Sequence, residues 1–164
     1  MSTRSAAELY QDDFYAWTQA QARELRRFAR TRPNLPLDLA HIAEEIADLG
    51  AERRNAVRSW TSRVIEHLLF FEHSPAQEPR RGSINEIVTL RRDIERRLTP
   101  VLARDLKHQL QARYDEARSD LTRKLMLYGE GDIVGRFPEH CPYTLNQVLG
   151  DFWPAPRRDG GRSS

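Results

Sequence analysis

The spacing of the apolar residues is the feature of this sequence that most restricts its fold. Apolar side chains recur every three or four positions through most of the chain, and the alternation typical of strands is nowhere sustained. This spacing predicts long amphipathic helices over 6–30, 39–73, 83–98 and 101–128. Each helix needs a neighbour to cover its apolar stripe, so the pattern indicates an up-and-down bundle of four main helices.

Breaking and capping residues set the expected ends of these helices. Two prolines within 31–36 cannot continue a helix interior, and Asp38 is a suitable N-cap for the helix that follows. Ser83 and Glu86 have the spacing of a capping box, which predicts a loop over 74–82. Gly50 falls inside the second helix, where it predicts a kink or a close helix crossing.

The end of the chain is expected to pack over this bundle. After glycines at 129, 131 and 135, an irregular segment leads to a short helix over 144–149, and the large apolar side chains of this region are too many for a solvated tail. They are Phe137, Tyr143, Leu145, Leu149, Phe152 and Trp153. We expect an all-α domain over 1–154, with a C-terminal irregular segment and short helix packed over it, and a disordered tail over 155–164.

Composition restricts the class of protein. The 164 residues include a single cysteine, Cys141, so no internal disulfide can form and the fold does not depend on an oxidising compartment. The longest run of large apolar residues is 68–71, far short of the roughly 20 residues that span a bilayer. The amino-terminal residues lack the apolar core of a secretory signal. We therefore expect a cytoplasmic protein of bacterial style that does not insert into a membrane.

Several sequence blocks resemble one known family. They are DFYAW at 13–17, LAHIAEEIADLG at 39–50 followed by ERR at 52–54, HLL at 67–69, FPEHCPY at 137–143 and FWP at 152–154. In this order they resemble the domain of unknown function twenty-nine family, and they extend over about residues 9–154. The resemblance implies an all-helical bundle and no established activity. His41 departs from it, since asparagine is expected there.

Polar residues on the apolar stripes mark a candidate site. Arg53 lies near the middle of the stripe of the second helix, Glu45 lies at its margin, and Gln21 takes the matching position on the first helix with Asp13 at the edge. Because a buried guanidinium needs a carboxylate or carbonyl partner, we predict a polar cluster of Asp13, Gln21, Glu45 and Arg53 between these helices. The cluster is either a structural network that fixes helix register or a binding site.

Other chemistry-bearing residues give weaker patterns. Asp38 with His41, and Asp105 with His108, have the i, i+3 spacing that places two ligands on one helix face, but di-iron bundles use glutamates there. We expect no metal site and no cofactor. Cys141 follows His140 directly, and adjacent side chains usually diverge, so a structural cysteine is expected.

The basic middle of the chain is the remaining candidate. Residues 80–124 carry 12 basic and 7 acidic side chains, a net +5. Much of this charge has a partner of opposite sign three or four residues away, as Asp120 has in Arg123 and Lys124. The one aromatic residue in this segment, Tyr114, belongs to the apolar stripe of its helix, so aromatic residues do not interleave with the arginines as in single-strand binding proteins. We therefore do not expect nucleic-acid binding.

These patterns lead to one main hypothesis and one alternative. The main hypothesis is a non-enzymatic helical module that binds an unknown protein partner or forms a homo-oligomer. The alternative is a small-molecule or metal-dependent enzyme that uses the polar cluster of Asp13, Gln21, Glu45 and Arg53.

Overall fold

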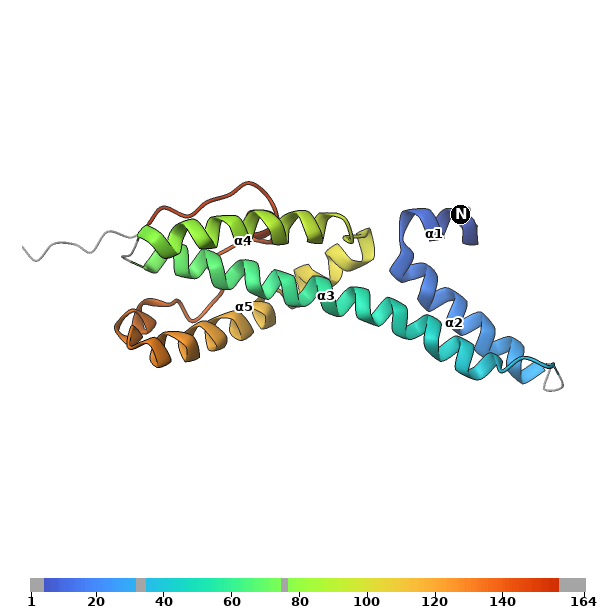
Figure 1. Cartoon of the computed structure of the whole chain (residues 1–164). Helices are drawn as coiled ribbons and strands as arrows, with labels where there is room; N and C mark the ends of the chain where they lie inside the picture. The colour runs from blue at the N-terminus through green and yellow to red at the C-terminus, as the bar shows by residue number, and fades with distance from the viewer. Residues whose placement is uncertain (1–4, 32–34, 75–76, 157–164) are drawn as a thin grey trace, which may run out of the picture. The chain divides into compact units, whose positions relative to one another are not determined.

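A computed structural model describes residues 5–31, 35–74 and 77–156. These residues form helices and no strand, which confirms the all-α expectation (Figure 1). The α-helices are α1 (Ala6–Asp12), α2 (Phe14–Thr31), α3 (Leu39–His73), α4 (Gln77–Glu95), α5 (Pro100–Tyr128) and α6 (Leu145–Leu149), with a 3₁₀ helix, η1 (Gly131–Arg136). Residues 157–164 of the expected tail lie outside the described residues.

The chain divides into two compact units. The first unit comprises Met1–Val57 with Arg97–Asp105, and the second comprises Arg58–Arg96 with Leu106–Ser164. Helix α3 contributes its first half to the first unit and its second half to the second. The expectation of a single domain over 1–154 stays a prediction.

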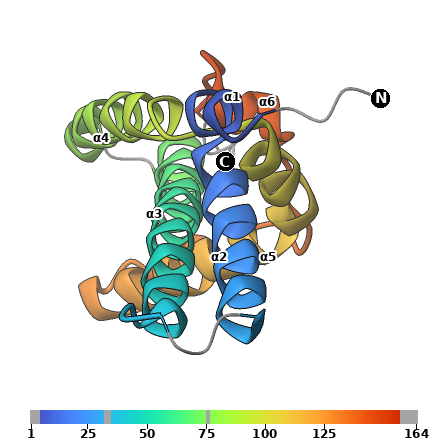
Figure 2. The ribbon, with the colours of Figure 1, turned by 90° about the vertical axis from the view of Figure 1, so that its right-hand side faces the viewer.

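In the first unit, α2 and the first half of α3 form an antiparallel hairpin (Figures 1 and 2). The single helix expected over 6–30 is wrong, because the chain breaks at Asp13. The Asp13 backbone is not helical, with φ −149° and ψ 82°, and its Oδ1 accepts a hydrogen bond from Ala16 N at 2.9 Å. An aspartate that binds the amide three residues on starts a new helix, and here that interaction outweighs the continuous apolar spacing.

Small residues form the contact between α2 and α3. Thr18, Ala22 and Ala43 are fully buried, and a Cβ atom added to Gly50 would lie 2.1 Å from Thr18 Oγ1. Gly50 therefore marks a close helix crossing, as its position in the sequence predicts. The two backbones approach closely because nothing larger stands between them.

In the second unit, α4 and α5 pack against the second half of α3 (Figure 1). Its buried apolar side chains come from all three helices and from the C-terminal segment. They are Val64, Ile65, Leu68, Leu69, Ile87, Leu90, Ile94, Leu106, Tyr114, Ala117, Leu121, Leu125, Ile133, Phe137, Tyr143 and Val148.

Helix α4 begins six residues earlier than the sequence predicts. The expected loop over 74–82 is mostly helix, with Pro79 in the first turn, where a missing amide costs no hydrogen bond. The expected capping box of Ser83 and Glu86 is wrong. Ser83 is buried within α4 with its Oγ 3.3 Å from His67 Nδ1, and Glu86 binds Arg63.

Candidate functional site

The four residues of the predicted polar cluster do not form one group. Asp13 and Arg53 lie near the start of α5, and Gln21 and Glu45 lie elsewhere. Asp13 is 2 % exposed, and its Oδ2 accepts a hydrogen bond from Val101 N at 3.0 Å, in the first turn of α5. Its two oxygens therefore bind the first turns of both α2 and α5, where a negative charge is favourable. Arg53 is half-buried and has an electrostatic attraction to Asp13, but its Nε donates a hydrogen bond to the carbonyl oxygen of Arg97 at 3.1 Å.

The other two predicted members lie elsewhere on the hairpin. Gln21 lines a shallow hollow formed by α2 residues from Gln21 to Thr31, and Glu45 is exposed on α3. Burial lowers the pKa of Arg53 from its ordinary value, and its guanidinium lies 5.3 Å from the centre of the Phe14 ring. The contacts described for Asp13 and Arg53 are with backbone groups and an aromatic ring.

The contact between Arg53 and Phe14 places the apolar stripes of α2 and α3 on the same side of the hairpin. We call this side the outer face. Its apolar residues are Phe14, Trp17, Leu25 and Phe28 on α2, and Ile42, Ile46 and Leu49 on α3. All are half-buried or exposed, with Leu49 at 52 %, Phe28 at 46 % and Ile42 at 39 %. Tyr10 of α1 packs on Phe14 and Trp17, with ring centroids 5.7 and 4.9 Å apart. The hairpin thus buries its small residues between its helices and leaves Phe28, Ile42 and Leu49 exposed.

The second unit contains a hollow large enough for a small molecule. A cavity of about 750 Å³ lies between α3, α4 and α5, with Phe70, Leu121 and Leu125 among its apolar lining residues. Such a volume falls within the range of small-molecule sites. The sequence analysis missed this cavity, since the spacing of residues within single helices does not show where three helices leave a gap.

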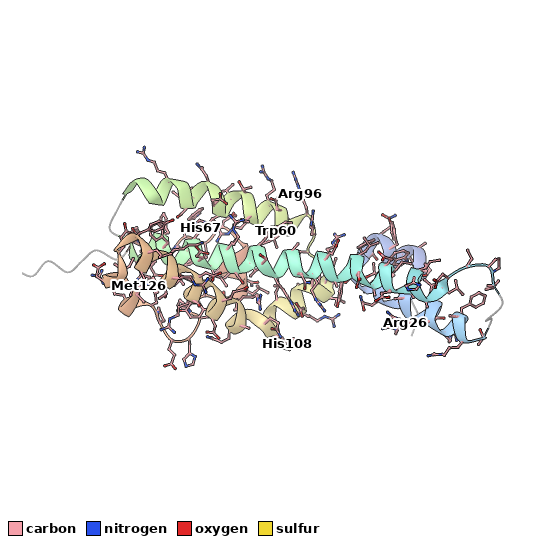
Figure 3. The ribbon with its side chains drawn as sticks, turned by 60° about the horizontal axis from the view of Figure 1, so that its bottom comes forward. Arg26, Trp60, His67, Arg96, His108 and Met126 are labelled. Carbon is pink, nitrogen blue, oxygen red and sulfur yellow. The ribbon has the colours of Figure 1, made fainter. Side chains whose placement is uncertain are left out.

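Two polar pairs cross the helices that form this cavity. Lys124 Nζ of α5 lies 2.5 Å from Glu66 Oε1 of α3, whereas the sequence suggested a partner on its own helix at Asp120. His67 of α3, labelled in Figure 3, shares a hydrogen bond with Ser83 of α4. Burial lowers the pKa of His67, so its imidazole is neutral at pH 7.

Within the second unit, hydrogen bonds join the C-terminal segment to each of the helices α3, α4 and α5. From α4, the Arg91 guanidinium donates to the carbonyl oxygens of Val148, Gln147 and Phe152, each at 2.9 Å. It also lies 5.3 Å from the centre of the Trp153 ring. Arg91, which belongs to the basic 80–124 segment, thus binds the backbone carbonyls around the end of α6.

Further bonds join this segment to α3 and α5. Tyr143 donates to Glu72 Oε2 at 2.8 Å, Tyr114 donates to the Pro138 carbonyl, and Gln111 Oε1 accepts from Cys141 N at 3.0 Å. Burial raises the pKa of Tyr114 to about 12, and burial together with the Glu72 contact raises the pKa of Tyr143. The FPEHCPY block at 137–143, one of those that carry the family resemblance, therefore attaches this segment to the helices.

Cys141 has the environment of a structural thiol. It is half-buried, its Sγ lies 3.4 Å from the Tyr143 carbonyl oxygen, and burial raises its pKa. A raised pKa reduces the thiolate fraction that a nucleophile needs. Neighbouring His140 is exposed.

The histidines of both motifs are exposed, and Asp105 of the second motif is half-buried. His41 Nδ1 is 2.5 Å from Asp38 Oδ2, and this hydrogen bond raises the pKa of His41 and lowers that of Asp38. His108 is exposed on α5 (Figure 3). Over 5–31, 35–74 and 77–156, no group of three or more His, Cys, Asp or Glu side chains could hold a metal ion. No helix in these ranges is long and apolar enough to cross a membrane.

Comparisons with known proteins identify the chain's relatives. The family model described as "Domain of unknown function DUF29" matches residues 9–153. Among solved structures, the chain is similar to an alpha-helical protein of unknown function from Rhodospirillum rubrum. The TM-score is 0.72 with 23 % sequence identity, over 92 % of each chain. That likeness shows the fold alone. No curated protein matches the chain.

Proposed function

This chain belongs to the family described as domain of unknown function DUF29, whose name assigns no activity, so we infer that its function follows from its own geometry. We propose a non-enzymatic helical module that self-associates through the outer face of the α2–α3 hairpin. One observation carries this proposal. The hairpin buries Thr18, Ala22 and Ala43 between its helices, while Leu49 and Ile42 stay exposed. Large apolar residues on one side of a helix pair are the half-core of a four-helix bundle.

A second copy of the chain is a suitable occupant of this face. Two-fold pairing is the commonest form of homo-oligomer, and it brings one apolar patch against its own equivalent. The outer face is bordered on α3 by Glu45 and Glu52, both exposed, and on α2 by an ion pair in which Arg27 binds Glu24 at 2.6 Å. Pairing α2 with α3 of the other copy brings this compensated ion pair towards the two carboxylates, whereas pairing α3 with α3 brings carboxylate against carboxylate, so the first arrangement has the smaller repulsion.

The test is the oligomeric state of the full chain. Analytical ultracentrifugation across a concentration series should show a dimer, and Leu49→Glu or Ile42→Glu should weaken it at least tenfold, because each places a charge in an apolar contact. Asn55→Glu is the matched control, since Asn55 is exposed on a different flank of α3. A monomer at all concentrations, or equal dimerisation by all three variants, would overturn the proposal.

The alternative of an enzyme built on Asp13, Gln21, Glu45 and Arg53 draws less support from these contacts. Both Asp13 oxygens accept backbone amides, and Arg53 Nε donates to a backbone carbonyl. Asp13 is only 2 % exposed, so its carboxylate stabilises the two helix ends and is not accessible to a substrate. A cytoplasmic location belongs to the same proposal and is supported by the single cysteine.

A further inference from the structure

The cavity of the second unit has a chemical character of its own. Its apolar part comes from Phe70 on α3 and from Leu121 and Leu125 on α5, which are 4 % and 1 % exposed. An apolar floor of this kind favours a ligand with a hydrocarbon or aromatic body. Because Leu121 and Leu125 expose almost no surface and Phe70 is half-buried, Phe70 is the main apolar contact of these three.

The charged groups of the cavity have a small acidic excess, one carboxylate more than the cations once Arg63 is counted. Three carboxylates line it, those of Glu66, Glu86 and Glu130, together with one ammonium group, that of Lys124. The Lys124 charge is already compensated by Glu66 at 2.5 Å. Even when Arg63 is included, which binds Glu86 at 3.3 Å, the carboxylates exceed the cations. A ligand carboxylate or phosphate would meet repulsion here, and an ammonium group would meet attraction.

Aromatic rings add to this preference. Phe70 lies among the lining residues, and Tyr128, which is 76 % exposed, stands at the mouth with its ring accessible. Aromatic faces attract organic cations through their quadrupoles. The neutral groups of the wall, Ser83 and His67, are bonded to each other and add no charge at pH 7.

We propose that this cavity between α3, α4 and α5 binds an amphipathic organic cation, an alkyl- or arylammonium compound, with its apolar body on Phe70, Leu121 and Leu125 and its ammonium group among Glu86, Glu130 and the Tyr128 ring. This site lies wholly within the second unit. It is independent of the outer face of the hairpin, so either proposal can fail without the other.

The test compares three probes that share one alkyl chain: octylammonium, octanol and octanoate. Isothermal titration calorimetry on the full chain, below the aggregation concentration of each probe, should show octylammonium binding at least about fivefold more tightly than octanoate, with octanol between them. The double variant Glu86→Gln with Glu130→Gln should weaken octylammonium binding about threefold or more and leave octanol binding unchanged. Octanoate binding as tightly as octylammonium would overturn the ligand class.

A blocking variant locates the binding. Gly82 lines the cavity on α4, and a Cβ atom added there meets nothing within 4 Å, so Gly82→Leu places a side chain in the space without a clash. It should abolish binding of all three probes, while Val88→Leu, at an exposed position on α4, should not. Thr89→Leu is the second blocking variant if Gly82→Leu fails to fold by circular dichroism. Unchanged octylammonium affinity in a folded blocking variant, or no binding by the unmodified chain, would refute the site.

Discussion

Replacing Gly50 by alanine tests the close crossing of α2 and α3. Alanine is favoured over glycine inside a helix by about 1 kcal/mol, so an unobstructed position gains stability. At Gly50 the new Cβ atom would lie 2.1 Å from Thr18 Oγ1 and 3.1 Å from Thr18 Cβ. A threonine on a helix cannot swing away as a long side chain can, so the helices must separate, and overpacking of this kind costs about 1–3 kcal/mol.

Gly82 supplies a control in which the same substitution lacks the clash. It lies within α4, and a Cβ atom there meets nothing within 4 Å, so Gly82→Ala should raise the free energy of unfolding by about 1 kcal/mol. The helix-propensity gain is common to both substitutions. Gly50→Ala should therefore fall below Gly82→Ala by the overpacking cost alone, about 1–3 kcal/mol.

The measurement is urea unfolding followed by far-ultraviolet circular dichroism for the two single variants and for Thr18→Ala with Gly50→Ala. Removing Thr18 Oγ1 takes away the nearest obstructing atom, so the double variant should recover part of the loss, with a coupling of about 1 kcal/mol. If Gly50→Ala stabilises the protein as much as Gly82→Ala does, the reasoning about the crossing is wrong.

Three further predictions concern the second unit. Arg91→Met should lower the free energy of unfolding by about 1.5–3 kcal/mol, because three carbonyls lose a charged donor, while Arg92→Met at an exposed position should change it little in the same urea assay. Burial lowers the pKa of His67, so its folded state favours the neutral form and stability should fall as the pH drops below 6.5; a pH series from 8 to 5 should show a smaller fall in His67→Gln. Deleting 137–164 should cause a large drop in melting temperature, because each large side chain buried there contributes roughly 1.5–3 kcal/mol. Deleting 155–164 should have almost no effect. If the longer truncation and the intact chain melt at the same temperature, the segment has no structural role.

Local patterns predicted the helices well wherever one helix was decided by its own residues. The apolar spacing and Asp38 placed α3 at Leu39–His73, and Thr144 caps α6 as the short predicted helix requires. The break at Asp13 was missed, because a carboxylate that can cap two helix ends has the same spacing as one that merely borders a stripe. The early start of α4 was missed because Ser83 has the local pattern of a cap, and only its contact with His67 shows otherwise.

The amino-acid sequence by itself determined the all-α class, the family, most helix positions and the packing of the C-terminal segment, since these follow from the periodicity of apolar residues and from caps within a few residues of each other. Only the tertiary structure decided which partner each polar side chain takes. Arg91 binds carbonyl oxygens more than fifty residues away in the sequence, and Lys124 of α5 binds Glu66 of α3. The cavity forms where α3, α4 and α5 leave a space between them. The physical reason is that a long side chain can reach several different partners. Which of them it contacts depends on how the helices are placed, and the spacing of residues within one helix does not encode that placement.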